Sequence, residues 1–210
     1  MGRTSAPRLL LLHGLRLKGF ASAEVLADFL ALDEPSVVEM LDKLHADGHV
    51  VHREGRLTGY SLTADGRAEH QALLAAELDE AAAREAIEEA YARFLELNPA
   101  LLAVCTRWQL RDVDAGVIND HSDPAYDAAV VAELQALDNS VEPVCHDLSA
   151  NLDRYAGYRP RLRGALERLC AGEVEYFTKP IIDSYHTVWF ELHEDLLATL
   201  GIERAAEGAS

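Results

Sequence analysis

Two short stretches of the sequence bring together side chains that could do chemistry. Residues 108–126 combine an indole, an imidazole, a phenol and several acidic groups, and residues 185–194 combine aromatic rings with two histidines. Aromatic walls with a few polar groups are typical of small-molecule pockets between helices. We therefore predict that a ligand contacts Trp108, His121, Tyr126, Tyr185, His186, Trp189 and His193. The alternative, in which these rings belong to the core and their polar tips are satisfied there, stays open.

The same two stretches do not have the spacing of a metal site. His186 and His193 fall on one face of a helix, but seven residues separate them by about 10 Å along its axis, too far for one metal ion. The H-E-x-x-H pattern is absent because Leu197 stands where the second histidine would be. Residues 112–116 lack the remaining acidic positions of a calcium loop. We expect no metal and no cofactor.

The sequence also lacks the short motifs of common enzyme classes. It contains no nucleophile elbow, no phosphate-binding loop, no dinucleotide fingerprint and no zinc signature. Cys105, Cys145 and Cys170 are odd in number and widely spaced, which favours free thiols over a redox pair. We therefore expect a protein that is not an enzyme, and we assign no catalytic residue.

The acidic charge of the chain is unevenly distributed. Of a net charge of −17, residues 1–70 carry −2, from 8 Lys and Arg against 10 Asp and Glu, and the rest carries −15, from 11 against 26. An acidic surface repels phosphate, so any nucleic acid must be bound by the first part. The apolar run at residues 9–12 is too short for a membrane span, and it lacks the cleavage site of a secretory signal. We expect a cytoplasmic protein with no membrane partner.

Residues 7–62 predict three helices followed by a hairpin. Apolar residues recur at helical spacing in the first three segments, and short alternating runs flank the turn Glu54-Gly55-Arg56. Small polar residues stand where the helices would begin, as helix caps do. The predicted elements are helices over 7–19, 23–30 and 33–48 and strands over 49–53 and 57–62, with Ser22, Asp33 and Thr63 as caps, the last for a further helix.

This order of elements is that of a winged helix-turn-helix, and the residues within it resemble a known family. The stretch SAEVLADFLALDEPSVVEMLDKLHADGHVVHREGRLTGYSLTADGRA is similar to the DNA-binding region of MarR-type and PadR-type bacterial transcriptional regulators. The similarity lies in the apolar spacing of the two middle helices, in LxxDGHV entering the hairpin and in LTADGRA leaving it. It covers only the N-terminal third of the chain.

The resemblance implies that the third helix enters the major groove of double-stranded DNA and that the hairpin, the wing, contacts phosphate. The predicted DNA-binding residues are Ser36, Glu39, Met40 and Lys43 on the outward face of that helix and Arg53 and Arg56 beside the turn of the wing. Further candidates for phosphate contacts are Arg3, Arg8, Arg16 and Lys18. In the alternative, the winged helix is a protein-interaction or accessory module that does not bind DNA.

Helical periodicity dominates the rest of the chain, with no strand pattern after residue 62. We predict a helix that runs almost unbroken from Thr63 to Leu97, within a bundle of five or six helices. The further helices are expected over 98–110, over 123–137, from 138 or 139 to a break at 157–160, and from there to about 172. The last helix is expected to be capped by Thr178 and to carry Ile181 to Leu200.

The predicted fold class is therefore mainly α, with an N-terminal winged helix-turn-helix over residues 1–70 and an all-helical bundle over residues 71–210. The predicted function is that of a cytoplasmic DNA-binding transcriptional regulator. The resemblance implies a homodimer. The helical domain is expected to sense a small-molecule effector, to pair subunits, or both.

Overall fold

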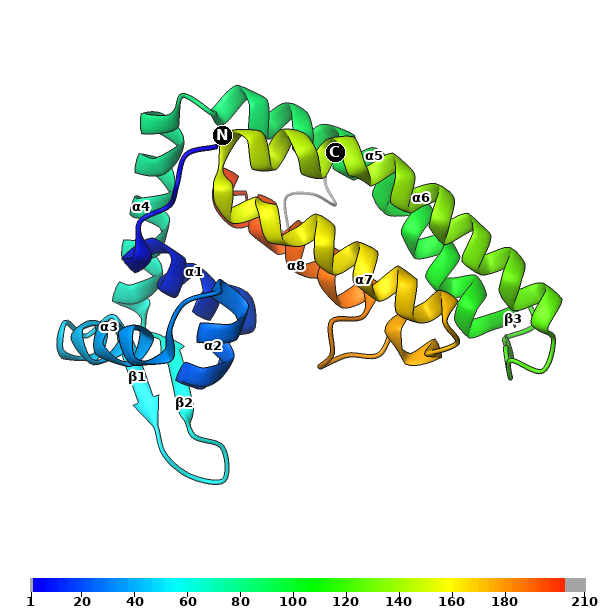
Figure 1. The fold of residues 1–210 in the computed structure, drawn as a ribbon, viewed down its shortest axis with the longest axis horizontal. Helices are drawn as coiled ribbons and strands as arrows, with labels where there is room; N and C mark the ends of the chain where they lie inside the picture. The colour runs from blue at the N-terminus through cyan, green and yellow to red at the C-terminus, as the bar shows by residue number, and fades with distance from the viewer. Residues whose placement is uncertain (1, 203–210) are drawn as a thin grey trace. The chain divides into compact units, whose positions relative to one another are not determined.

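The computed structural model describes residues 2–202, and the chain is mainly helical (Figure 1). It divides into two compact units. The N-terminal unit consists of Arg3–Arg84 and the chain from Glu194 onward, and the helical unit consists mainly of Glu85–His193. This division differs from the predicted boundary at residue 70, because the helix after the hairpin and the end of the last helix both belong to the N-terminal unit.

The N-terminal unit contains three helices, a two-stranded antiparallel hairpin and a fourth helix, in that order. The first helix packs against the second and the fourth, and the second packs against the third. The hairpin loop projects away from these helices (Figure 1, cyan). The elements are α1 Pro7–Lys18, α2 Ala23–Leu30, α3 Glu34–Ala46, β1 Val50–Arg53, β2 Gly59–Leu62 and α4 Ala64–Ala81.

The predicted caps fix where three of these helices begin. The side chains of Ser22, Asp33 and Thr63 each accept the backbone N–H three residues further on, at 3.0 to 3.3 Å. Such a bond satisfies one of the donors that the first helical turn leaves open and contributes about 1 kcal/mol. Gly66, in the first turn of α4, lies against the carbonyl of His49, where a Cβ atom would come within 1.9 Å of the oxygen. The start of α4 therefore requires glycine.

One apolar core holds these elements together. It combines side chains of the first three helices with one from each strand, and its buried members are Leu11, Leu12, Leu15, Ala21, Leu26, Ala27, Val37, Leu41, Leu44, Val50 and Leu62. Burying a leucine of this kind contributes roughly 2 kcal/mol. Helix α3 supplies only one face to this core, so its opposite face is left on the surface.

A left-handed residue makes the turn between α2 and α3. Ala31 has φ +52° and ψ +43°, and the N–H of Leu32 returns to the carbonyl of Ala27 at 3.0 Å. Glycine is the usual residue in this conformation, because a Cβ atom costs about 1 kcal/mol there. The backbone at Ala31 is therefore strained, and the packing of α2 and α3 holds it in place.

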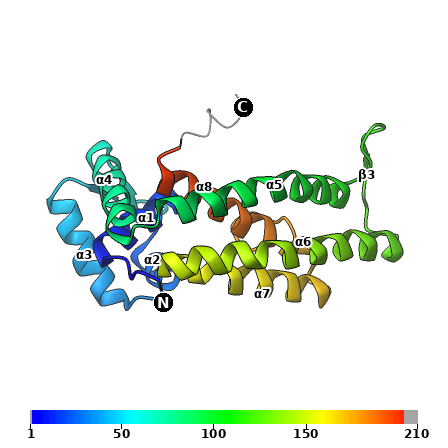
Figure 2. The same cartoon turned by 90° about the horizontal axis from the view of Figure 1, so that it is seen from above.

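The helical unit is built from long α-helices with short 3₁₀ turns and a second small hairpin. Helix α6 packs against α7, as Figure 2 shows. The elements are α5 Arg84–Gln109, β3 Leu110–Asp112, β4 Val117–Ile118, α6 Pro124–Asn151, a 3₁₀ turn at Asp153–Gly157, α7 Tyr158–Cys170, a second 3₁₀ turn at Val174–Tyr176, and α8 Tyr185–Leu200. None of the described helices is both long enough and apolar enough to cross a membrane.

Two predicted helix boundaries in this region are wrong. Pro99 lies inside α5 rather than at the start of a new helix, and α6 is continuous through residues 138 and 139 and through Pro143. An internal proline costs about 3 kcal/mol in an isolated helix. Both helices bury side chains on either side of their proline, Phe94 and Leu101 in α5 for example, and this burial offsets the cost.

Three other predictions also fail. The helix expected from Thr63 to Leu97 is interrupted at Ala82, which has φ +49° and separates α4 from α5. Strands β3 and β4 form an antiparallel pair, although no strand was expected after residue 62. The last helix begins at Tyr185 and not after a cap at Thr178, because Ile181 has φ +77°, which no α-helix allows.

Replacing Ala31 with glycine tests the strain in the α2–α3 turn. Ala31→Gly is expected to raise the free energy of unfolding by about 0.5 to 1 kcal/mol, because glycine adopts positive φ without a Cβ penalty. The matched control is Ala72→Gly in the exposed middle of α4, which should lower it by about 1 kcal/mol. Urea denaturation followed by circular dichroism measures both. Equal losses in the two variants would contradict strain at Ala31.

Candidate functional site

The outer face of α3 gathers most of the residues predicted to read DNA. Ser36, Glu39 and Lys43 are exposed, whereas Met40 is partly buried and packs against the N-terminal core. The ammonium of Lys43 lies 2.6 Å from a carboxylate oxygen of Glu39, one helical turn away. This hydrogen bond lowers the pKa of Glu39, so the glutamate stays ionised. The face therefore presents a neutralised ion pair and gains no net positive charge.

The β1–β2 hairpin carries two arginines that no carboxylate of the described chain neutralises, Arg53 and Arg56. Arg53 ends β1 opposite Gly59, and Arg56 lies in the loop between the strands; both side chains are exposed. Neither arginine has an ion pair or a hydrogen bond to any residue between 2 and 202. Behind them, the rings of His52 and Tyr60 stack across the strands with centroids 4.5 Å apart. The hairpin thus presents two unpaired guanidinium groups on a stiffened base.

The four other residues predicted to contact phosphate already contact side chains of the N-terminal unit. Arg3 pairs with Glu80. Arg8 lies 3.2 Å from both Asp47 and Glu69. The remaining two contacts join Arg16 to Glu194 at 3.5 Å and place the ammonium of Lys18 4.3 Å from the ring centroid of Phe29. Carboxylates close to three of these four cations cancel the charge that a phosphate would meet.

Three of the seven predicted ligand residues come together at the end of α5. Trp108 is 5% exposed, and its ring centroid lies 4.5 Å from that of His121 and 4.8 Å from that of Phe177. The hydroxyl of Tyr126 donates to the backbone carbonyl of Arg107 at 3.0 Å. The indole is thus enclosed by protein rings, and the tyrosine ties the start of α6 to the end of α5.

His121 is held in an unusual conformation. Its φ is +59°, and its Nδ1 lies 3.0 Å from a carboxylate oxygen of Asp127. The amide of the buried Asn119 donates to the other oxygen of Asp127 at 2.8 Å, and its carbonyl accepts the backbone N–H of His121 at 3.2 Å. These bonds compensate for the strained backbone and fix the orientation of the imidazole.

The other four predicted ligand residues lie on α8. Tyr185, Trp189 and His193 are buried, and His186 is half-buried. The indole N–H of Trp189 donates to Asn98 at 3.1 Å. Phe94 contacts two of these rings, with centroids 4.7 Å from Trp189 and 5.3 Å from His193. The two groups of predicted ligand residues are joined through Phe177, whose ring contacts Trp108 and whose carbonyl accepts the backbone N–H of His186 at 3.0 Å, and most of these rings are buried as core aromatics are.

A network of charges joins Tyr185 to α6 and α7. Asp138 is 4% exposed and accepts hydrogen bonds from the Tyr185 hydroxyl at 3.2 Å and from Arg159 at 2.6 Å. Arg159 also reaches Glu142 at 3.1 Å. Burial, together with the carboxylate of Asp138, raises the pKa of Tyr185 well above its usual value. The phenol therefore stays a neutral donor.

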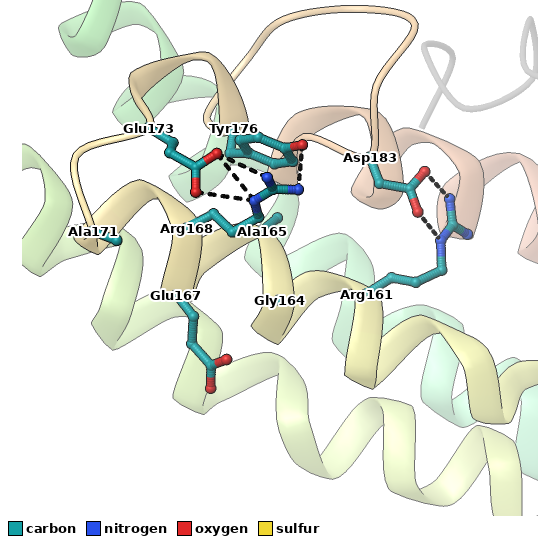
Figure 3. Close-up of a pocket in the computed structure, with 9 residues that line it drawn as sticks. All are labelled: Arg161, Gly164, Ala165, Glu167, Arg168, Ala171, Glu173, Tyr176 and Asp183. Carbon is teal, nitrogen blue, oxygen red and sulfur yellow. Dashed lines mark hydrogen bonds and ion pairs between the residues drawn. The ribbon is translucent and has the colours of Figure 1, made fainter.

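A cavity of about 440 Å³ opens at α7 and the segment that follows it (Figure 3). It is lined by Arg161, Gly164, Ala165, Glu167, Arg168, Ala171, Glu173, Tyr176 and Asp183, none of which was predicted to bind a ligand. Figure 3 shows an ion pair on either side of the Gly164–Ala165 floor. The pattern that indicates this cavity is an arginine pair seven residues apart, which places both on one helix face above small residues.

Both arginines of this cavity already hold carboxylates. Arg161 binds the two oxygens of Asp183 at 2.8 and 2.9 Å. Arg168 lies 2.9 Å from Glu173 and 4.0 Å from the ring centroid of Tyr176. A small anion would have to displace these side chains, so the cavity as it stands favours a neutral or cationic ligand.

The thiols and the acidic groups do not form a metal site within residues 2–202. No group of three or more His, Cys, Asp or Glu side chains in this range could hold a metal ion. Cys105 and Cys145 are buried, and burial raises the pKa of each thiol to about 12. Cys170 is exposed. The two buried thiols are therefore inert packing groups at neutral pH.

Removing Asp138 is expected to be one of the most damaging single changes in the helical unit. Asp138→Ala removes the buried carboxylate that accepts from both Arg159 and Tyr185, and losing a hydrogen bond to a charged group costs about 1.5 to 3 kcal/mol of unfolding free energy for each bond. Tyr185→Phe removes only one neutral donor and should cost about 1 kcal/mol. Chemical denaturation compares the two variants. Similar small losses of unfolding free energy in both variants would show that the network does not hold α6, α7 and α8 together.

The half-buried His186 makes stability depend on pH. Burial lowers the pKa of His186 below its ordinary value of 6.5, so the unfolded chain binds this proton more readily than the folded one. The unfolding free energy should therefore fall as the pH drops through 6.5 and level off below the folded pKa. His186→Asn should flatten this response, whereas the exposed control His146→Asn should keep it. Thermal denaturation between pH 8 and 5 is the measurement, and an unchanged response in His186→Asn would contradict the assignment.

The geometry thus gives two candidate sites, the exposed surface formed by α3 and the β1–β2 hairpin and the cavity at α7. Comparison of the chain with family models, curated proteins and solved structures finds no match.

Proposed function

We propose that the protein is a DNA-binding transcriptional regulator and that its N-terminal unit is a winged helix-turn-helix. In this proposal α2 and α3 form the helix-turn-helix, α3 is the recognition helix and the β1–β2 hairpin is the wing. The order of elements and the exposed outer face of α3 support the assignment. The observation that carries it is the pair of exposed wing arginines, Arg53 and Arg56, which have no acidic partner in the described part of the chain.

The electrostatics assign different roles to the wing and to α3. Phosphate contacts supply most of the affinity of such proteins, and only unpaired cations can make them at low cost. Arg53 and Arg56 meet this condition. Ser36, Glu39 and Lys43 would face base edges, where the Glu39–Lys43 pair offers an acceptor and a donor side by side. Affinity would therefore depend on the wing, and sequence preference on α3.

We further propose that the helical unit senses a small molecule, pairs two copies of the chain, or does both. The cavity at α7 is the candidate effector site. An effector that prefers one arrangement of the helical units in a dimer would change the spacing of the two winged helices and so the affinity for an operator.

A second candidate function is docking on a partner protein. Three apolar side chains of the N-terminal unit favour it, since Leu57 at the wing loop is 73% exposed, Val25 on α2 is 47% exposed and Val38 on α3 is 38% exposed. Exposed apolar side chains can take part in a protein interface when they form one patch. In this case the same surface would bind apolar side chains rather than a duplex, and binding would be insensitive to salt.

Removing the two wing arginines tests the proposal. A DNA fragment from the promoter next to the gene is titrated at two or more salt concentrations. Arg53→Ala/Arg56→Ala should weaken binding and reduce the slope of log affinity against log salt by about 2, one counterion for each lost phosphate contact. Fluorescence anisotropy measures both quantities.

The control has the same change in net charge. Arg93→Ala/Arg163→Ala removes one partly buried and one exposed arginine of the helical unit and should leave both affinity and slope unchanged. Undetectable or salt-independent binding by the wild type would overturn the DNA proposal and favour the protein partner. An equal effect of both double variants would show that net charge, not the wing, drives the association.

A further inference from the structure

The interior of the N-terminal unit contains a chain of polar groups that links three helices. Nδ1 of His13 on α1 lies 2.9 Å from Nε2 of His70 on α4. Nε2 of His13 lies 3.0 Å from a carboxylate oxygen of Asp195 on α8, and the hydroxyl of Thr199 donates to the other oxygen at 3.0 Å. All four residues are at most 3% exposed. Neither the DNA surface nor the cavity at α7 uses any of them.

The contact between the two imidazoles limits how many protons the site can hold. A bond between ring nitrogens needs N–H on one ring and a lone pair on the other. One added proton is tolerated, because His13 can then donate to Asp195 and to His70 together. A second added proton places N–H against N–H at the 2.9 Å contact and leaves two positive charges beside one carboxylate. Two positive charges repel each other in this buried site, so this contact must break.

Other charged groups lie on the same helices. Glu77 is buried on the same face of α4 as His70, but seven residues place it about 10 Å further along the axis. Arg16 on α1 and Glu194 on α8 form an ion pair with each other at 3.5 Å. Asp195 is the carboxylate that contacts His13 directly, at 3.0 Å.

At the junction of α8 with α1 and α4, buried apolar side chains lie beside this network. Its compact apolar cluster consists of Leu9, Leu74 and Ala198. A cavity of about 480 Å³ lies alongside, lined by Arg16, Gln71, Glu194, Leu197, Ala198, Gly201 and Ile202. Two of these residues are direct chain neighbours of His70 and Asp195. The cavity therefore lies next to the network, and the polar contacts hold the end of α8 here together with the apolar cluster.

We propose that the proton is an effector of this protein, with His13, His70 and Asp195 as its binding site. At neutral pH the network fastens residues 194–202 to α1 and α4. When both imidazoles are protonated, the contact between them opens and residues 194–202 separate from α1 and α4. The consequence for DNA affinity rests on the proposed function, whereas the opening itself does not.

Hydrogen–deuterium exchange of the full chain between pH 7.5 and 5.5 tests the opening. After correction for the intrinsic pH dependence of exchange, protection of residues 194–202 should fall at least about tenfold relative to α2. In His70→Gln, which keeps a hydrogen-bonding group but removes one of the two titrating rings, protection should not change with pH. The controls His45→Gln and Glu77→Gln should behave as the wild type. A constant protection in the wild type, or an equal fall in His70→Gln, would overturn the proposal.

A second measurement covers the case in which His70→Gln does not fold. Imidazole nitrogen resonances of the wild type report which ring nitrogens carry hydrogen at each pH. Full protonation of His13 and His70 should coincide with the loss of protection in residues 194–202. Full protonation while protection persists would overturn the proposal, because the doubly protonated pair would then be compatible with the closed contact.

Binding of the promoter fragment at pH 7.5 and 5.5 separates this inference from the proposed function. A change in affinity that His70→Gln abolishes supports both. Exchange that follows pH as expected, without DNA binding at either pH, upholds the proton site and overturns the regulator proposal. Equal affinity at the two pH values, with the junction open at the lower one, overturns the regulatory role of the proton.

Discussion

The excess of acidic over basic residues determines which cations on this protein stay unpaired. Nineteen Lys and Arg residues face thirty-six Asp and Glu residues, so most cations lie beside a carboxylate of their own unit. Arg8, Arg107 and Arg161 are examples from both units. An arginine that escapes this pairing stands out electrostatically, because no neighbouring charge cancels its field. Arg53 and Arg56 escape it because the hairpin loop carries them away from the acidic helices, and this is why the proposed DNA contact depends on so few groups.

Inside the units, the corresponding constraint is that a buried polar group needs a partner. Tyr185 and Trp189 have the composition of a ligand pocket, yet each directs its polar atom to a side chain of the same unit, Asp138 or Asn98. Their rings then fill the space that a ligand would occupy. The cavity at α7 forms instead where small side chains, Gly164 and Ala165, leave room between two ion pairs.

The sequence was informative where a local interaction decides the structure. Helix caps such as Ser22 and Asp33 act over three residues, and the hairpin follows from its turn, so these elements could be predicted. The break at Ala82 and the continuity through Pro99 could not, because burial along a helix face decides them against local propensity.

The site residues divide in the same way. The exposed positions of α3 follow from helical periodicity, but which cations stay unpaired depends on contacts between distant segments, such as that of Arg16 with Glu194. The network of His13, His70 and Asp195 is the extreme case, since its members belong to three helices and none is close to another in sequence. A single histidine on an apolar helix face gives no indication of a partner. Only the fold supplies the second imidazole and the carboxylate.

The wing and the histidine network both belong to the N-terminal unit, but the wing carries exposed, permanently charged arginines, whereas the network consists of buried groups that bind a proton. Arg53 and Arg56 lie on the hairpin, whereas the network joins α1, α4 and the end of α8, so protonation of the network leaves the wing cations and their number unchanged. A proton would thus act on how firmly α1 and α4 are held, and through α1 on the core that positions α3. In the proposed function, α3 makes the base contacts and the wing makes the phosphate contacts. A drop in pH would therefore change the position of α3 and leave the electrostatic attraction between the wing and the duplex unchanged.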